Sequence, residues 1–346
     1  MQVVKKVLVA LSGGVDSAVT AALLLEQGYD VVGVNMQLLP AFDGECVDGG
    51  ARQVARELGI EFHSLDCQTQ FNREIVQNFC QEYFHGRTPN PCILCNRHMK
   101  FAYLLRVADD LGIEYLATGH YACVDHSGKY SVLRRGQDSK KDQSYFLFTL
   151  SSQQLSRVIF PLGNITKQEV QRIARRLNLS ARNNGESQDI CFIPDNDYIS
   201  FLENQSLQLP EAGDIVHVDG AIIGHHQGIH RYTIGQRRGL GIGWSEPLYV
   251  VAVDSIERRV IVGEKHHLET MVMQVENVVW SQPIAQFPLR VDCRIRYRHC
   301  EALATISLQG DQSVHVVFDQ PQTGVTPGQA AVFYQEDCVI GGGWIQ

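Results

Sequence analysis

The chain has 346 residues, of which 44% are hydrophobic and 20% are charged, and its formal net charge is −8. This length allows two or three domains with separate cores, and the composition is typical of a soluble globular protein. No apolar run approaches the roughly 20 residues of a membrane span, so we expect no membrane contact. The acidic balance argues against a diffuse nucleic-acid-binding surface but allows local basic patches. Without a recognisable signal peptide, a cytoplasmic location is expected.

Strands and helices alternate over roughly the first 195 residues. Apolar runs predict strands over the ranges Lys6–Leu11, Asp30–Met36, Glu61–Asp66 and Glu114–His120. Helical periodicity, with Thr166 as one possible N-cap, predicts helices over the ranges Asp16–Gln27, Gly49–Leu58, Thr69–Gly86, Arg97–Leu111 and Lys167–Leu177. This alternation predicts an α/β doubly wound parallel sheet that binds a nucleotide at the carboxyl ends of its strands.

The turn after the first strand reads Ser12-Gly13-Gly14-Val15-Asp16-Ser17. Its two glycines allow a sharp turn and a close approach to a ligand, and the N–H groups at the start of the next helix can bind an anion. The turn lacks the lysine of a Walker A loop and does not match the dinucleotide fingerprint. An ordinary Gly-rich turn is the alternative, which six specified residues between a strand and a helix disfavour.

This turn resembles the pyrophosphate loop of the ATP-pyrophosphatase superfamily, which has an adenine-nucleotide alpha-hydrolase-like fold. The resemblance implies that Ala10, Leu11 and the six residues of the turn bind ATP, and that Asp16 helps to hold Mg²⁺. At the ends of two other strands, Met36 can contact the adenine and Gly119 allows a close approach to the nucleotide. A core position for Met36 is an equally good interpretation, and His120, beside Gly119, has an ordinary structural alternative.

Three cysteines stand apart from the other seven. Cys92 and Cys95 precede the helix predicted from Arg97, and Cys191 lies at a break before the β-rich part of the chain. We expect a lowered pKa for the Cys95 thiol because of nearby Arg87, Arg97 and His98. A zinc site with His98 and a purely structural pair are two interpretations. In the third interpretation, two thiols face each other across a substrate and carry out sulfur chemistry. An ATP-binding turn elsewhere in the chain favours this interpretation, because a substrate activated by ATP needs a nucleophile.

Beyond Pro194 the chain becomes rich in glycine and in short alternating runs. These runs predict strands over the ranges Asp214–Val218, Tyr249–Val253, Val291–Tyr297, Ala302–Ser307, Ser313–Phe318 and Gln329–Tyr334. We therefore expect a catalytic domain over residues 1–198, a small central β domain over 199–268 and a C-terminal β-barrel over 269–346.

Over nearly its whole length the sequence resembles the bacterial tRNA-specific 2-thiouridylase family. The segments that carry the resemblance include Gly86–Pro91, Leu94–Asn96, Lys100–Phe101, Ala117–Tyr121, Lys141–Leu147, Asp189–Ile193, Thr233–Gly243, Arg296–Arg298 and Thr326–Ala330. The resemblance implies an enzyme that adenylates O2 of the wobble uridine of tRNA (position 34) and releases pyrophosphate. Sulfur then replaces the activated oxygen, which gives 2-thiouridine and AMP. Rival interpretations are an ATP pyrophosphatase that ligates a small molecule and an RNA-binding protein with a zinc knuckle.

The resemblance also implies roles for the three cysteines. Cys191 matches the cysteine that receives a persulfide from a sulfur-donor protein, a cysteine desulfurase or a relay. Cys95 matches the nucleophile, which forms a transient disulfide with Cys191 or assists the attack. Cys92 stands where many members carry an Asp proposed as general acid/base. A thiol is a better metal ligand, so Cys92, Cys95 and Cys191 holding a [4Fe–4S] cluster is an open alternative to the persulfide route.

Contacts with the anticodon stem-loop of tRNA follow from the same resemblance. The residues that meet the extruded target base are Asn90, Pro91 and Cys92. The other expected tRNA contacts are His120, Lys141, Asp142, Gln143, Arg296, Tyr297 and Gln329. Independently, Arg294, Arg296 and Arg298 would project from one side of a strand and could grip phosphates. A second basic cluster contains Arg134, Arg135, Lys140 and Lys141. We expect a monomer.

Overall fold

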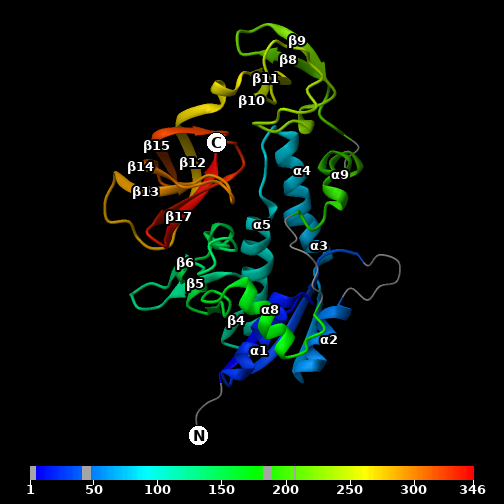
Figure 1. Ribbon diagram of the computed structural model, residues 1–346, viewed down its shortest axis with the longest axis vertical. Helices are drawn as coiled ribbons and strands as arrows, with labels where there is room; N and C mark the ends of the chain where they lie inside the picture. Colours follow the sequence, from blue (N-terminus) through cyan, green and yellow to red (C-terminus); the bar gives the residue numbers. More distant parts are fainter. Residues whose placement is uncertain (1–4, 41–47, 182–188, 206–207) are drawn as a thin grey trace.

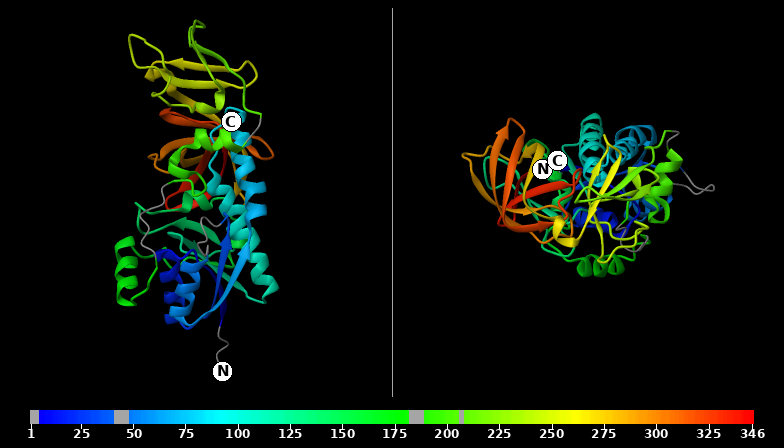
Figure 2. Two further views of the ribbon diagram at one scale, coloured as in Figure 1. Left: turned by 90° about the vertical axis from the view of Figure 1, so that its right-hand side faces the viewer. Right: turned by 90° about the horizontal axis from the view of Figure 1, so that it is seen from above.

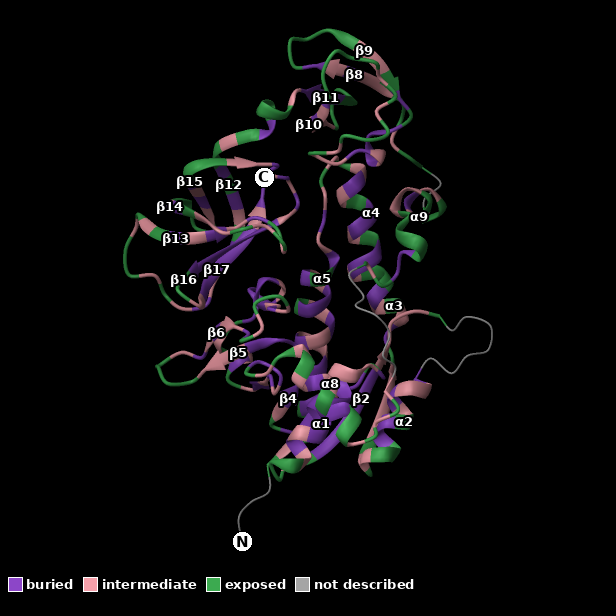
Figure 3. Cartoon of the chain, viewed as in Figure 1, coloured by how far each residue is buried: buried purple, intermediate pink, exposed green. Residues whose placement is uncertain are grey.

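The computed structural model describes residues 5–40, 48–181, 189–205 and 208–346. In Figure 1 the N-terminal α/β region lies at the bottom, a small sheet at the top, and a β-barrel at the left between them. None of the helices in these ranges is long and apolar enough to cross a membrane. Buried residues concentrate in the lower sheet with its helices and in the barrel strands (Figure 3).

In the described residues, a five-stranded parallel sheet forms the N-terminal region, with the order β3-β2-β1-β4-β7. Its strands are β1 (Lys6–Ala10), β2 (Asp30–Gln37), β3 (Glu61–Asp66), β4 (Tyr115–Ala117) and β7 (Val158–Ile159). Val7, Leu8 and Val9 of the central strand are fully buried, as expected for a strand covered on both faces. The predicted doubly wound fold class is confirmed.

Helices cover both faces of this sheet. On one face α1 (Val15–Glu26) packs against α2 (Gly49–Leu58) and α8 (Lys167–Arg176), over Val7 and Val9. The Thr166 side chain accepts a hydrogen bond from the Glu169 N–H (3.2 Å), so its predicted N-cap role is confirmed. The opposite face packs Leu8 against the long helix that carries two of the thiols.

Both long helices on that opposite face contain a π-helical segment. The first runs through α3 (Gln68–Phe71), η1 (Asn72–Val76) and α4 (Gln77–Phe84). The second runs through α5 (Pro91–Leu94), η2 (Cys95–Tyr103) and α6 (Leu104–Asp110). The prediction that this second helix starts near Arg97 is wrong. It starts at Pro91, because Asn90 is the N-cap and a proline is preorganised for the first helical position.

The small sheet at the top has the strand order β10-β11-β8-β9. Its strands are β8 (Gly213–His217), β9 (Ile222–His226), β10 (Tyr249–Asp254) and β11 (Arg259–Gly263). Its core includes the fully buried Val250, Val260 and Val262. Short helices elsewhere are η3 (Ser144–Leu147), α7 (Ser152–Leu155), η4 (Pro194–Asn196), α9 (Tyr198–Gln205), η5 (Ile229–Arg231) and η6 (Lys265–Leu268).

The barrel closes through pairing of its first and last strands, β12 and β17. Its strands are β12 (Glu269–Trp280), β13 (Leu289–Arg294), β14 (Ala302–Gly310), β15 (Ser313–Thr323), β16 (Ala330–Gln335) and β17 (Cys338–Ile345). A hairpin from the N-terminal region, β5 (Ala122–Asp125) and β6 (Val132–Arg135), joins the same sheet, where Arg134 faces Cys338. In the view from above in Figure 2, the barrel lies beside the long helices. The N-terminal region and the barrel are therefore joined through one sheet.

Candidate nucleotide and thiol site

The glycine-rich turn joins β1 to α1 and is tied together by its serines. The Ser17 hydroxyl donates to the Gly14 carbonyl (3.0 Å), and the Ser12 N–H donates to Ser17 Oγ (3.2 Å). Gly14 is the N-cap of α1 and provides no side chain to cap the first turn. The helix start is therefore open to an external anion, which its N–H groups and dipole favour.

Two glycines allow close packing at this turn. Gly13 has φ +79°, and a Cβ there would lie 3.0 Å from the backbone nitrogen of Ala51. A Cβ on Gly119, which follows β4, would lie 3.0 Å from the backbone of Asp16 and Ser17. Gly119 therefore lies against the turn, and its contact with the nucleotide stays a prediction.

The remaining predicted nucleotide contacts lie on the neighbouring strand ends. Ala10 ends β1 and Leu11 follows it, and the Leu11 carbonyl accepts a hydrogen bond from Asn35 Nδ2 (2.7 Å). Met36 of β2 is partly buried and packs against two hydrophobic clusters. These residues share the carboxyl edge of the sheet with the turn.

Asp16 binds two residues, Tyr121 and Lys167, whose position beside it was not predicted. The Tyr121 hydroxyl donates to Asp16 Oδ1 (2.8 Å), and Lys167 Nζ lies 2.6 Å from the same oxygen. Lys167 is the first residue of α8, and its own N–H donates to Asp138 Oδ2 (3.0 Å). The cation missing from the turn thus comes from a helix 151 residues later. In the sequence, Thr166 predicts where α8 starts. It does not predict which residues the start of α8 contacts.

The three singled-out cysteines form one group of free thiols. Cys92 lies in α5, Cys95 begins η2, and Cys191 lies in a loop near the start of η4. The charge of Cys95 interacts with those of Cys92 and Cys191, and Cys191 interacts with Cys92. Cys95 is buried, whereas Cys92 and Cys191 each expose surface to solvent. The structure therefore brings together the residues that sequence reasoning grouped.

The expectation of a lowered thiol pKa is wrong. Burial raises the pKa of Cys95 to about 11, and the surrounding protein also raises the pKa of Cys92 and of Cys191. Two of the three side chains expected to lower it point to acids: Arg87 pairs with Glu82 (2.6 Å), and His98 faces Glu74 (4.0 Å). Loss of hydration therefore dominates over nearby positive charge.

Lys100 is the cation that does act on the thiols, and sequence reasoning gave it no role. It lies five residues after Cys95 on η2, which is the hydrogen-bond spacing of a π-helix. Its ammonium lowers the pKa of Cys92, Cys95 and Cys191, though by less than burial raises it. The same charge, after the larger effect of burial, lowers the pKa of His120, the residue that follows Gly119. Lys100 thus links the thiols to the strand end that touches the glycine-rich turn.

A metal centre was one alternative for these thiols. Across the described ranges, no three Cys, His, Asp or Glu side chains are arranged to hold a metal ion. As they lie in this structure, Cys92, Cys95 and Cys191 do not fit an iron–sulfur cluster, and Cys92, Cys95 and His98 do not fit zinc.

Three family models match the chain in succession. The tRNA methyl transferase HUP domain matches residues 5–195, the tRNA methyl transferase PRC-barrel domain matches 200–264, and the aminomethyltransferase beta-barrel domain matches 270–345. The tRNA-specific 2-thiouridylase MnmA of Syntrophotalea carbinolica is 55% identical, over 99% of this chain and 98% of its own. The chain belongs to the tRNA-specific 2-thiouridylase family. Its Geobacter metallireducens member is 48% identical over 99% of this chain and 96% of its own.

The likeness to a solved structure is weaker. A 4-thiouridine synthetase in complex with RNA and ATP covers 58% of this chain, with 50% of its own length, 20% identity and a TM-score of 0.37.

Several residues expected to contact tRNA make internal contacts in this family member. His120 is buried, and its Nδ1 forms a hydrogen bond with Thr118 Oγ1 (2.7 Å). Asp142 is buried and accepts from the N–H groups of Gly136 (3.0 Å) and Ser144 (3.1 Å). The Gln143 side chain accepts from the Tyr121 N–H (3.0 Å). Each of these contacts helps to hold the segment between β4 and η3.

The predicted row of arginines along one strand is wrong. Strand β13 ends at Arg294, so Arg296 and Arg298 lie in the following turn and do not alternate with it. Arg294 turns inward toward Asp142 (3.5 Å) and Glu301 (3.3 Å), and Arg296 donates to the Thr323 carbonyl (3.2 Å). The second basic cluster is also partly neutralised, because Arg134 and Arg135 pair with Asp337 and Glu301.

The predicted target-base residues Asn90, Pro91 and Cys92 form the start of α5. Asn90 also lines a cavity of about 540 Å³ between the thiol-bearing helix and the barrel. Other residues around this cavity are Arg87, Arg97 and Trp344. The polar and aromatic lining and the size suit an unpaired nucleotide.

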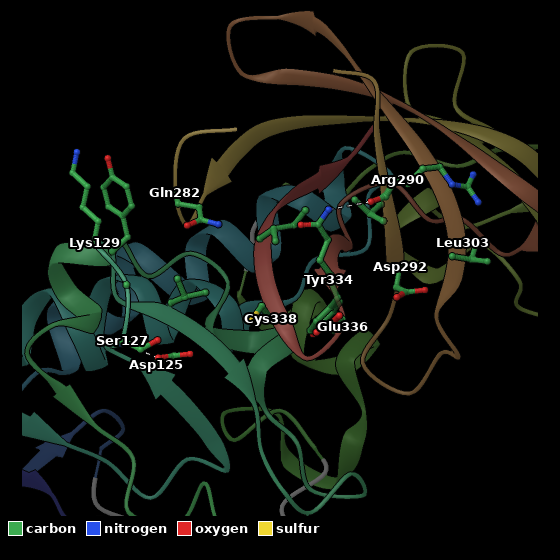
Figure 4. A pocket seen from close by; sticks show the side chains of 16 residues that line it. Asp125, Ser127, Lys129, Gln282, Arg290, Asp292, Leu303, Tyr334, Glu336 and Cys338 are labelled. Carbon is green, nitrogen blue, oxygen red and sulfur yellow. Dashed lines mark hydrogen bonds between the residues drawn. The ribbon is translucent and has the colours of Figure 1, made fainter. Parts of the chain in front are cut away.

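A second cavity, of about 630 Å³, lies between the β5–β6 hairpin and the barrel (Figure 4). Lys129 and Asp125 line it from the hairpin, and Arg290 and Tyr334 line it from the barrel. None of the predicted site residues lines this cavity, so we do not assign it to the reaction.

Proposed function

We propose that this chain converts the wobble uridine of tRNA into 2-thiouridine, with ATP as the activating co-substrate. Its whole-length match to curated 2-thiouridylases supports the reaction class. The observation that carries the proposal is the continuity of the site. Gly119 packs on the glycine-rich turn, and the ring of its neighbour His120 lies 5.7 Å from the ring of Phe101, in the π-helical segment that begins at Cys95. A phosphate-binding turn and reactive sulfur thus meet at one edge of the sheet.

The turn Ser12–Ser17 would hold the phosphates of ATP, with Ala10, Leu11, Met36 and Gly119 around the adenosine. Mg²⁺ is commonly bound by one or two carboxylates together with the phosphates of its substrate, and Asp16 offers one such carboxylate. The residues present therefore fit Mg²⁺, which when bound neutralises charge on the phosphates. Lys167, held on Asp16, is placed to add a second positive charge.

In the first step, O2 of the uridine attacks the α-phosphorus of ATP. The new O2–P bond forms as the bond to the bridging oxygen breaks, pyrophosphate leaves with that electron pair, and the N3 proton of the uridine passes to water. The N–H groups at the start of α1 and the Lys167 ammonium stabilise the departing charge. The step turns a poor leaving group, a carbonyl oxygen, into AMP.

In the second step, a persulfide on Cys191, supplied by a sulfur-donor protein, attacks C2 through its outer sulfur. The C2–S bond forms and the C2–O bond to AMP breaks. The Cys95 thiolate then attacks the inner sulfur, which releases 2-thiouridine and leaves a Cys95–Cys191 disulfide. The two cysteines supply the two electrons that reduce the transferred sulfur, so a thiol reductant must restore them. In the alternative order, Cys95 attacks first and hydrosulfide adds to C2.

No step in this proposal passes through an iron–sulfur cluster, because the three thiols do not fit one as they lie. The predicted tRNA contacts stay predictions, as do the roles of Asn90, Pro91 and Cys92 at the target base. These contacts are His120, Lys141, Asp142, Gln143, Arg296, Tyr297 and Gln329. We also propose the three-part division at residues 198 and 268, a monomer, and action in the cytoplasm.

The test is nucleoside mass spectrometry of unmodified tRNA, incubated anaerobically with the enzyme, Mg-ATP, and a cysteine desulfurase with cysteine. We expect 2-thiouridine only when ATP is present, and a loss of at least about 100-fold in Cys191→Ser because the transferable sulfur has no carrier. Cys300→Ser, which removes an exposed thiol of the barrel, is the matched control.

AMP without any thionucleoside would contradict tRNA as the substrate while supporting ATP activation. Neither product would contradict the whole proposal. Full activity of Cys191→Ser would remove the persulfide route.

A further inference from the structure

The segment between α4 and α5, residues 85–90, leads directly into the helix that carries Cys92 and Cys95. It has no helix or strand of its own, and Pro89 and Pro91 lack the N–H groups through which a chain is usually held. Its position therefore depends on what contacts it from outside.

Glu82 of α4 holds Arg87, and the C-terminal barrel supplies the contacts of Thr88 and Pro89. Gln329 Nε2 donates to the carbonyl oxygens of Thr88 (2.9 Å) and Pro89 (3.3 Å). In return, the Thr88 N–H donates to the Pro327 carbonyl (2.8 Å). Three hydrogen bonds thus join two residues of this segment to one turn of the barrel, across about 240 residues of sequence.

Close packing reinforces these hydrogen bonds. Gly328 has φ +89°, and a Cβ there would lie 2.9 Å from the Thr88 carbonyl oxygen and 3.0 Å from its nitrogen. On the other side, a Cβ on Gly86 would lie 2.8 Å from Val253 Cγ1 of the small sheet. The segment is therefore enclosed between the barrel and the small sheet.

The barrel turn is itself rigidly attached. The Gly328 N–H donates to the Ile345 carbonyl (2.9 Å), and the Ile345 N–H donates to the Gln329 carbonyl (2.8 Å). These bonds fix the turn to the end of β17, the strand that closes the barrel.

We infer that the turn 326–329 is a clamp that holds the thiol-bearing helix in register with the nucleotide turn, and that Gln329 is a positioning residue. Its amide donates to protein carbonyls, so its work is to order the segment that precedes Cys92. The barrel then has a direct part in the chemistry, beyond any contact with RNA. This kinetic consequence rests on the proposed function, whereas the ordering of the segment does not.

The test compares Gln329→Ala with Gln322→Ala in the full chain. Gln322 is the matched control, because its amide also donates to two consecutive carbonyls, of Gln320 (3.0 Å) and Pro321 (3.2 Å), but within its own strand. The readouts are hydrogen exchange of the Thr88 amide and its neighbours, the Kd for an unmodified anticodon stem-loop RNA, and kcat and KM for thiolation.

For Gln329→Ala we expect Thr88 exchange at least tenfold faster, kcat at least tenfold lower, and a Kd within twofold of wild type. Gln322→Ala should change none of them by more than twofold. Gly328→Ala adds a methyl group that pushes on the same segment, so it should change exchange and kcat in the same direction as Gln329→Ala. It is the second variant of the test in case Gln329→Ala folds poorly.

A Gln329→Ala variant with unchanged exchange and a weaker Kd would overturn the clamp and make Gln329 an RNA contact. Unchanged exchange with unchanged Kd would also overturn it. If the wild-type enzyme makes no 2-thiouridine, the proposed function fails, but faster Thr88 exchange in the variant would still support the clamp.

Discussion

At the scale of single residues, the pair Asp16–Lys167 shows how the turn obtains a positive charge that its own motif lacks. A Walker A loop carries its lysine within the motif, whereas here the cation arrives from the first residue of α8. Both side chains are mostly shielded, with exposed fractions of 22% for Lys167 and 35% for Asp16, so the pair is less screened than a surface salt bridge.

We predict that Lys167→Met lowers the rate of pyrophosphate release by about 100-fold, because one donor to the departing charge is lost. The affinity for tRNA should stay within about twofold, since the turn lies away from the barrel. Lys265→Met, at the start of an exposed short helix, is the control. Equal rates in the two variants would contradict a role for Lys167 at the phosphates.

The glycine-rich turn could be predicted residue by residue, because Gly13, Gly14 and the serines act within six positions of one another. Lys167 and Tyr121 could not, since their contact with Asp16 depends on how α8 and β4 are placed by the whole sheet. The inward turn of Arg294 escaped prediction for the same reason: its partners Asp142 and Glu301 lie on other elements.

At the scale of elements, the helix from Pro91 to Asp110 decides the chemistry of the thiols. Its existence follows from apolar periodicity, but its start and its π-helical part do not, because periodicity does not reveal a wider helical turn. The π-helical spacing brings Lys100 one turn beyond Cys95. Burial in that helix raises the pKa of Cys95 to about 11, so a nearby positive charge is needed to favour the thiolate.

We predict that Lys100→Gln raises the pKa of Cys95 further, because the ammonium favours the charged thiolate. At pH 9 most Cys95 is protonated, so its alkylation by iodoacetamide should slow by about 3- to 10-fold, and its pH profile should move to higher pH. Arg97→Gln is the control. Arg97 is a cation of the same helix, but the pKa of Cys95 is shifted by burial, by Lys100 and by the other two thiols rather than by Arg97. A profile that does not move in Lys100→Gln would contradict this prediction.

At the scale of the whole molecule, backbone hydrogen bonds join the N-terminal region to the barrel at two places among the described residues. One is the clamp at residues 326–329, and the other is the β5–β6 hairpin, which extends the barrel sheet at β17. The sequence indicated three successive domains and a small barrel. It gave no sign that a hairpin of the first would pair with the third, because β6 is only four residues long and its partners are far away in sequence: Arg134 faces Cys338, and the Arg135 N–H donates to the Asp337 carbonyl (2.9 Å).

Arg135 should hold that second join more strongly than an ordinary surface pair. Its guanidinium lies 3.8 Å from the centre of the Tyr334 ring and pairs with Glu301, and both charged side chains are less than a quarter exposed. We predict that Arg135→Met lowers the free energy of unfolding by about 2 kcal/mol, since the cation–π contact is lost and Glu301 is left with its pair to Arg294.

The control is Arg259→Met, which should lower the free energy of unfolding by less than about 0.5 kcal/mol. Arg259 lies 3.7 Å from Glu257, and both side chains are about half exposed. Urea unfolding followed by tryptophan fluorescence measures the difference, because Trp280 and Trp344 both lie on barrel strands. If Arg135→Met is no more destabilising than Arg259→Met, the hairpin does not stabilise the barrel through this residue.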